Sequence, residues 1–281
     1  MQVVRNDEGS PSSGSSAVAA MVGLGLGMVL YMFLMIYGAM VMQSVIEEKS
    51  SRVLEVVVSS VRPFELMMGK IFGVASVAVV QVLIWAVLVC GAGAAVMPHV
   101  LPDGAMEAAA ALQQGGGAAT AAAGDFDPET LGAIALATDV GYLAMLFGYL
   151  LLFVVGGYLL YSAMFAAVGS AVDNAQDAAQ LQTPIMIPII LAVIVEMSVL
   201  NDPNSPLAFW FSLIPFTSPV VMMARIPYGI PTWEIVLSLV LLYAAFVGMV
   251  WLSAKIYRVG IFMYGKKPTL REMFRWIRYK Y

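Results

Sequence analysis

Five long apolar runs constrain the fold of this sequence more than any other feature. A helix needs about 20 predominantly apolar residues to cross the roughly 30 Å hydrocarbon core of a bilayer. All backbone polar groups must be satisfied inside such a segment, and a helix does this. The runs are residues 17–42, 71–97, 140–168, 183–200 and 233–257. They predict an all-α polytopic membrane protein with about five transmembrane helices.

The composition excludes several classes of protein. Of the 281 residues, 61% are hydrophobic and 11% are charged, and the mean hydropathy is +0.87. Soluble domains carry about 45–50% apolar and about 25% charged residues. Soluble enzymes, disordered chains and nucleic-acid-binding proteins are therefore disfavoured, and the lipid bilayer is the expected environment. The single cysteine, Cys90, excludes an intrachain disulfide and a cysteine-based metal cluster.

The distribution of Lys and Arg predicts the orientation of these helices. Cytoplasmic loops are enriched in Lys and Arg near the ends of transmembrane helices. With five crossings, residues 45–70, 169–182 and the C-terminal tail share one side, and that side holds 12 of the 14 cations. These are Lys49, Arg52, Arg62, Lys70, Lys255, Arg258, Lys266, Lys267, Arg271, Arg275, Arg278 and Lys280. We expect a multi-pass protein of the cell membrane with its N-terminus outside and its C-terminus in the cytoplasm.

The remaining segments divide the chain into three expected parts. Residues 1–16 form a polar extracellular tail, residues 17–257 a transmembrane domain, and residues 258–281 a basic cytoplasmic amphipathic tail. Thr269 and Glu272 have the spacing of a capping box that starts a helix in this tail. Residues 98–139 are rich in Ala and Gly, which is typical of a flexible loop or a poorly packed helix.

Two short apolar pieces precede the last predicted span. Residues 207–215 and 219–226 are too short to cross the bilayer. Prolines interrupt the region at Pro206, Pro215, Pro219, Pro227 and Pro231. This pattern predicts an outer re-entrant or interfacial hairpin.

The connection at residues 45–70 is long for antiparallel helices, which are usually joined by about 2–8 residues. An apolar stripe at helical spacing predicts an amphipathic helix on the cytoplasmic side; its members are Ile46, Val53, Leu54, Val57 and Val61. Pro63 disfavours helix at Arg62, so we expect a break there. Two interpretations are open: a helix lying on the membrane surface, or a docking element for a cytoplasmic partner.

The same segment resembles ABC-2-type permeases, the membrane subunits of ATP-binding-cassette exporters. The resemblance rests on Glu47-Glu48-Lys49, Arg52, Leu54-Glu55, Ser59-Ser60, Pro63, Glu65-Leu66 and Gly69-Lys70. It is strongest to the sodium-efflux permease branch, whose C-terminal ending is also similar to Arg258-Val259-Gly260 and Tyr264-Gly265-Lys266-Lys267-Pro268. In that family the cytoplasmic segment is the coupling helix that contacts the ATPase. The resemblance implies this partner-binding role for Glu47, Glu48, Arg52 and Glu55.

The resemblance also implies partners and a departure from the family. It implies a separate ABC ATPase subunit and a homodimer or heterodimer of permease chains. Family members usually begin with a further span and an extracellular domain, and residues 1–16 resemble the end of such a domain. We therefore expect either an N-terminally truncated copy or fragment, or a chain whose missing half is supplied separately.

A nucleotide site of the P-loop type, G-x-x-x-x-G-K-[ST], is absent from the sequence. Gly69-Lys70 is followed by Ile71, and Gly265-Lys266 by Lys267, so neither pair completes the motif. The chain is thus expected to be a transporter subunit rather than an enzyme, with no catalytic residue, no metal site and no cofactor of its own. ATP and magnesium are expected on the partner.

Two other functions remain open. Glu47-Glu48 followed by Arg52 matches the E-E-x-x-x-R pattern of intramembrane CAAX-type proteases, but that resemblance requires further histidines and the chain has only His99. A non-transporting scaffold or regulatory subunit is the other alternative, and it is favoured by the expected truncation.

Glu196 is the one acidic residue well inside a predicted span. A carboxylate in hydrocarbon costs about 2.5–3.5 kcal/mol on insertion scales. It either lies on a substrate path facing a polar interior, or snorkels to the outer boundary about 6 Å away along the helix. We favour snorkelling and keep the substrate path, with sodium as the ion suggested by the resemblance, as the functional hypothesis.

Overall fold

The structure, a computed structural model, describes residues 13–51, 61–101, 104–113, 128–263 and 269–276. Five of its helices are long and apolar enough to cross a membrane. They are α1 (Ser13–Ser50), α3 (Pro63–Val100), α7 (Val140–Ala171), α8 (Ala175–Val199) and α11 (Thr232–Gly260). The prediction of an all-helical polytopic membrane protein is confirmed.

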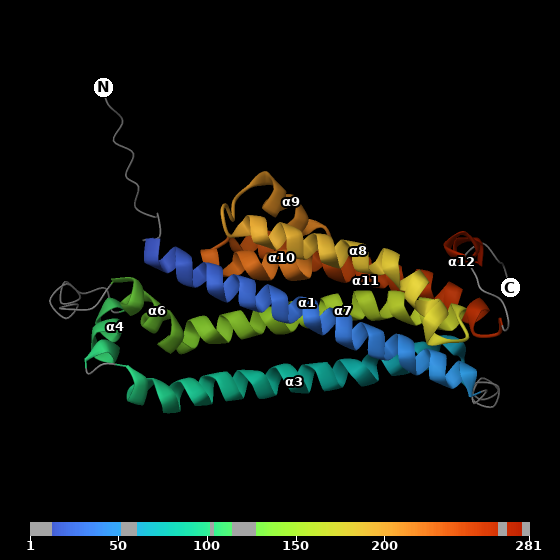
Figure 1. Cartoon of the computed structure of the whole chain (residues 1–281), viewed down its shortest axis with the longest axis horizontal. Coiled ribbons are helices and arrows are strands. Elements are labelled where there is room, and N and C mark those ends of the chain that lie inside the picture. The colour runs from blue at the N-terminus through green and yellow to red at the C-terminus, as the bar shows by residue number, and fades with distance from the viewer. Residues whose placement is uncertain (1–12, 52–60, 102–103, 114–127, 264–268, 277–281) are drawn as a thin grey trace, which may run out of the picture.

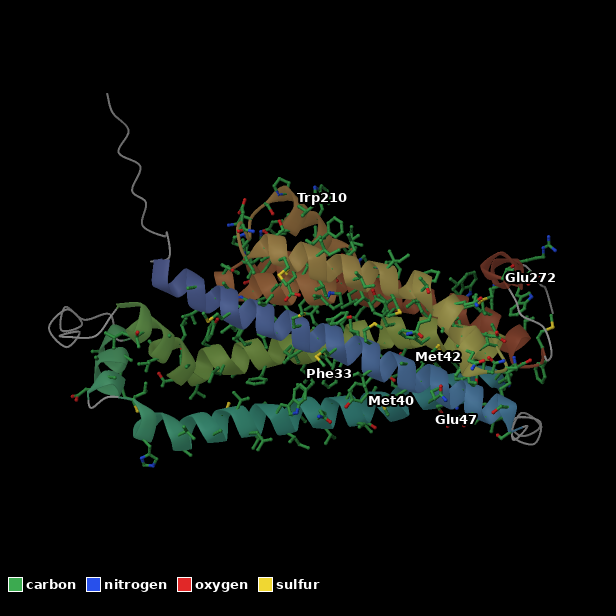
Figure 2. The ribbon with its side chains drawn as sticks, viewed as in Figure 1. Phe33, Met40, Met42, Glu47, Trp210 and Glu272 are labelled. Carbon is green, nitrogen blue, oxygen red and sulfur yellow. The ribbon has the colours of Figure 1, made fainter. Side chains whose placement is uncertain are left out.

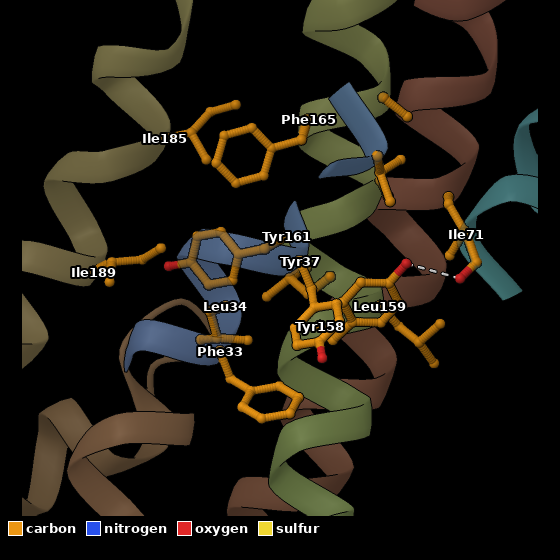
Figure 3. Close-up of a cluster of buried hydrophobic side chains, with 14 of the residues drawn as sticks. Phe33, Leu34, Tyr37, Ile71, Tyr158, Leu159, Tyr161, Phe165, Ile185 and Ile189 are labelled. Atoms are coloured by element: carbon orange, nitrogen blue, oxygen red, sulfur yellow. Dashed lines mark hydrogen bonds between the residues drawn. The ribbon is translucent and has the colours of Figure 1, made fainter. Parts of the chain in front are cut away.

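The long helices lie side by side along the longest axis of the molecule (Figure 1). Helix α7 packs most extensively against α1 and α11, and α3 lies along one side of this group. Figure 3 shows part of the shared core, in which the hydroxyl of Tyr158 on α7 donates a 2.8 Å hydrogen bond to the carbonyl of Ile71 on α3. The core side chains labelled there come from four helices: Phe33, Leu34, Tyr37, Ile71, Tyr158, Leu159, Tyr161, Phe165, Ile185 and Ile189.

Several helices extend beyond the predicted spans. Helix α1 continues to Ser50 and α3 begins at Pro63, so much of the segment 45–70 belongs to these two helices. Helix α8 begins at Ala175 rather than at residue 183, because Asn174 caps its N-terminus by accepting a hydrogen bond from the Asp177 amide. Hydropathy detects only the apolar part of a helix, so the predicted spans omit the polar turns at the helix ends. The break at Arg62 is confirmed, since Pro63 starts α3.

The hairpin between α8 and α11 is present as two short helices. They are α9 (Pro206–Leu213) and α10 (Ser218–Arg225), followed by the 3₁₀ turn η1 (Ile226–Tyr228). Every residue of α10 is buried, and α10 packs against α1 and α8. Helix α10 is thus an inserted part of the core, whereas α9 keeps Leu207 and Trp210 exposed.

The remaining helices cover the two ends of the bundle. Helices α4 (Ala105–Gln113) and α6 (Pro128–Thr138) pack against each other at one end, so the described part of 98–139 is largely helical. Helix α12 (Leu270–Trp276) lies at the opposite end (Figure 1). One half of its predicted capping box is formed, since the Thr269 amide donates to the Glu272 carboxylate at 2.9 Å.

Candidate functional site

Two of the four predicted coupling residues lie in the last turn of α1. Glu47 is exposed and accepts a 3.2 Å hydrogen bond from Gln43 on the same helix; Figure 2 shows it near the end of α1. Glu48 is half-buried and forms a 2.8 Å ion pair with Lys70 of α3. Arg52 and Glu55 lie outside the described residues, so their coupling role stays a prediction.

Lys70 links the ends of α1 and α3. Besides its ion pair with Glu48, its ammonium group donates to the carbonyl and the hydroxyl of Ser44, at 2.9 and 2.8 Å. All three partners lie on α1. A displacement of the end of α1 therefore acts directly on the start of α3.

Lys49, which follows Glu48 on α1, is completely buried. Its ammonium group donates to the carbonyl of Ser170 at 2.8 Å and to that of Gly260 at 2.9 Å, and it pairs with Asp173 at 3.1 Å. Ser170 and Gly260 lie in the last turns of α7 and α11, where unpaired carbonyls carry partial negative charge. We call these four residues the Lys49 junction; it joins the ends of α1, α7 and α11.

Small residues allow the helices to approach closely enough to form this junction. A Cβ atom on Gly260 would lie 2.8 Å from the Ser170 hydroxyl and 2.9 Å from its carbonyl oxygen. A Cβ on Gly169 would lie 2.8 Å from the carbonyl oxygen of Met42 on α1. A side chain at Gly260 would separate α11 from α7, and one at Gly169 would separate α7 from α1, the helix that carries Lys49.

Sequence reasoning placed Lys49 among the polar residues of the coupling segment, and its burial was missed. The signal was available: Val41, Val45 and Lys49 recur at every fourth position, and the two valines are buried. A lysine that continues an apolar stripe at this spacing faces the protein interior.

An open cleft of about 510 Å³ lies at the same end of the bundle. It is lined by the start of α3 and the end of α11: Arg62, Pro63, Phe64, Glu65, Arg258 and Phe262. Phe64 and Phe262 are exposed. Together with Glu47 and Glu48, these residues give the end of the bundle a mixed charged and aromatic surface.

The hairpin contains a second buried cation. Arg225, at the end of α10, is 1% exposed and pairs with Glu234 of α11 at 2.9 Å. It also donates to the Ser212 hydroxyl at 2.6 Å and to the Pro203 carbonyl at 2.8 Å. Arg225 is the single Lys or Arg between Lys70 and Lys255 in the sequence, and this isolation could have marked it as structural.

Glu196 lies three residues before the end of α8 and is fully buried. In the described part of the chain neither of its carboxyl oxygens has a hydrogen-bond partner. The carboxyl group packs against Gly27 of α1, where an added Cβ would lie 2.7 Å from the carboxyl carbon. Snorkelling to the surface, the interpretation we favoured, is therefore wrong for this conformation: the side chain faces the interior.

The structure does not bring the predicted sites together. Glu196 packs beside Gly27, and Gly27 precedes Glu47 by 20 residues on the same helix. At 1.5 Å per residue this is a separation of about 30 Å along α1. His99 lies at the far end of α3, in its last turn. Among the described residues, no group of three or more His, Cys, Asp or Glu side chains is placed to hold a metal ion.

These features define a class: a multi-pass helical membrane protein with a charged helix junction at one end. A family model described as ABC-2 family transporter protein matches residues 5–255. The chain therefore belongs to the ABC-2 family of transporter membrane proteins. ABC-2 permeases generally pair with ABC ATPase subunits, and their permease domains typically lack a nucleotide-binding site.

Two curated relatives are similar over most of this chain. The uncharacterized protein YhaP of Bacillus subtilis strain 168 is 27% identical over 246 residues, which are 87% of this chain and 52% of that protein. The uncharacterized protein MJ1024 of Methanocaldococcus jannaschii is 27% identical over 260 residues, or 92% of this chain and 54% of that protein. The chain thus spans about half the length of these relatives. No solved structure matches it significantly.

Proposed function

We propose that this chain is the permease subunit of an ATP-binding-cassette exporter, with ATP and magnesium bound by a separate ATPase subunit. Family membership supports the transporter role. The observation that carries the rest is the charged end of α1 and α3, where exposed acidic residues lie next to a buried junction that joins three transmembrane helices. The ATPase docks at this end, through Glu47, Glu48, Arg52 and Glu55.

The contacts provide a route for force into the membrane. Movement of the ATPase displaces the end of α1, and the Glu48–Lys70 ion pair passes the displacement to α3. Lys49 passes it to α7 and α11 through the Ser170 and Gly260 carbonyls. Because all these helices continue across the core, the substrate path between permease chains responds to nucleotide.

The orientation and the substrate complete the proposal. The end of the bundle at Lys49 faces the cytoplasm and the hairpin faces outward, as the distribution of Lys and Arg indicates. The permease chains act as a homodimer or heterodimer, and the substrate moves outward past Glu196. Sodium is the proposed substrate, on the resemblance to the sodium-efflux branch.

The docking surface is tested by charge reversal. Glu47→Arg is the cleaner variant, because the Glu47 side chain is exposed and reversal leaves the Glu48–Lys70 pair in place. We expect it to reduce co-purification with the ABC ATPase and ATP-driven efflux from vesicles at least tenfold. Glu107→Arg makes the same change on an exposed residue of α4, at the opposite end, and should retain both. Normal docking and transport by Glu47→Arg and Glu48→Arg would contradict the proposal.

A further inference from the structure

Glu196 is a buried carboxyl group without the partners that every other buried charge described above has. The residue is fully buried, and both carboxyl oxygens lack hydrogen-bond partners among the described residues. An ionised carboxylate in such a place loses its hydration and gains nothing in return. The neutral acid avoids most of this cost, since it carries no net charge.

Among the described residues, no charged side chain compensates an ionised Glu196. Helix α8 packs against α10, α1, α7 and α9, and α9 has no titratable residue. The titratable residues of the other three are Arg225 on α10, Tyr31, Tyr37, Glu47, Glu48 and Lys49 on α1, and Tyr142, Tyr149, Tyr158 and Tyr161 on α7. None of them bonds the Glu196 carboxyl group. Arg225, the one cation on α10, is committed to Glu234 and Ser212.

The site is shaped by two glycines of α1. Gly27 leaves room for the Glu196 carboxyl group, and a Cβ there would meet its oxygens. Gly23, one turn earlier, lies against the backbone of Ala224 on α10. The carboxyl group is therefore enclosed where α1 approaches both α8 and α10, and a small separation of these helices would open the site.

We propose that Glu196 is a proton-binding site, occupied in the closed conformation described here and exposed when α1 and α8 separate. The proposal rests on the function proposed above, because the transport cycle supplies that separation. On opening, water reaches the carboxyl group, the O–H bond breaks, its electron pair stays on the carboxylate oxygen and the proton passes to water. On closing, the carboxylate takes a proton from hydronium, which leaves as water, since no described residue offers the carboxylate another partner.

Infrared spectroscopy of the purified full chain in lipid vesicles tests proton occupancy directly. The carbonyl stretch of a protonated carboxyl group is separate from the bands of ionised carboxylates, and exposed acids are ionised at neutral pH. We expect the wild-type chain to show a protonated carboxyl band at pH 7 that Glu196→Gln loses. Glu107→Gln removes an exposed acid and should keep the band. Absence of the band in the wild type, or its persistence in Glu196→Gln, would overturn the proposal.

A pair of glycine variants tests the location of the proton. Gly27→Ala places a methyl group against the Glu196 carboxyl group and should shift the band, whereas Gly25→Ala should leave it unchanged because nothing lies within 4 Å of an added Cβ there. Glu196→Asp keeps the acid and moves it, so its band should persist at a shifted position. Equal spectra for Gly27→Ala and Gly25→Ala would contradict the assignment.

Proton release is tested with the ATPase present. Addition of magnesium and ATP to the complex should decrease the band in the wild type, and an unchanged band would overturn the exchange step. The two proposals fail separately. A chain that has the band and binds no ATPase contradicts the permease function alone, and a complex that transports but lacks the band contradicts the proton site alone.

Discussion

The Lys49 junction and the Glu196 site are two buried ionisable positions at opposite ends of the helix bundle. They differ in the polar partners that surround the ionisable group. The Lys49 ammonium group meets two helix-end carbonyls and the Asp173 carboxylate within 3.1 Å. The Glu196 carboxyl group has no partner among the described residues and lies against a glycine. One site binds its charge permanently, and the other is enclosed without a charge to balance it.

This difference indicates a structural role for the Lys49 junction and a functional role for Glu196. A buried charge with several partners holds the ends of helices in one arrangement, and removing it leaves those partners unsatisfied. A buried group without partners adds no stability as an ion, so its presence points to a role in another conformation. Substitutions at charged or closely packed helix contacts should therefore lower the free energy of unfolding by amounts that depend on how deeply the contact is buried.

Removing the Lys49 charge should have the largest effect on stability. Lys49→Met leaves the Asp173 carboxylate and two helix-end carbonyls without their cation, which should lower the free energy of unfolding by about 3–5 kcal/mol. Lys255→Met makes the same change in a residue whose ammonium group lies over the Trp251 ring at 3.8 Å, and should cost about 0.5–1 kcal/mol. Denaturation of purified chains in mixed detergent micelles measures both. Equal losses of unfolding free energy in the two variants would show that the Lys49 junction stabilises the fold no more than the contact of Lys255 with Trp251 does.

Removing the Arg225 charge should cause the second largest loss of stability. Arg225→Met breaks the ion pair with Glu234 and two hydrogen bonds, and leaves a nearly buried carboxylate unpaired. We expect a loss of about 2–3 kcal/mol. The double variant Arg225→Met with Glu234→Met should recover part of this loss, because it removes the orphaned charge as well. The same unfolding assay measures the stability of the single and the double variant. A double variant less stable than the single one would refute the pairing.

A matched pair of glycine variants in α11 should give an intermediate effect. Gly260→Ala places a methyl group 2.9 Å from the Ser170 carbonyl oxygen, and overpacking of this kind costs about 1–3 kcal/mol. Gly248→Ala meets no atom within 4 Å, and should stabilise the helix by up to about 1 kcal/mol. Opposite signs in the unfolding free energy are expected. Two stabilising substitutions would mean that α7 and α11 are not held closely at Gly260.

Glu48 should have the smallest effect on stability. Its side chain is 37% exposed, and solvent screening limits pairs of this type to about 0.5 kcal/mol. Glu48→Gln should therefore unfold almost as the wild type does, while ATP-driven efflux from vesicles should fall, because we propose that Glu48 serves coupling. A loss of stability as large as that of Lys49→Met would place Glu48 in the structural core instead.

The fold was largely predictable, and the sites were predictable only in part. Mean hydropathy over about 20 residues locates the five long helices because burial in lipid demands apolar side chains along the whole span. It misses polar end turns, so the first eight residues of α8 were assigned to a loop. The break at Pro63 was found because proline restricts the backbone of the residue before it.

The errors concern which side of a helix a polar residue faces. Lys49 was grouped with its polar sequence neighbours although its helical spacing from Val45 places it inside. Glu196 was expected at the outer boundary because its distance from the helix end is short. Both errors share a cause: the direction of a side chain depends on which helices pack around it, and the partners come from segments over 100 residues away.

We propose that the end of the bundle at Lys49 faces the cytoplasm, where the ATPase docks. Cysteine labelling in intact cells tests it most directly, after Cys90→Ser removes the one native thiol. Ser50→Cys and Asn201→Cys replace exposed residues at the two ends of the bundle. A membrane-impermeant thiol reagent should label Asn201→Cys from outside and Ser50→Cys only after the membrane is permeabilised. Labelling of Ser50→Cys in intact cells would contradict this orientation of the helix bundle.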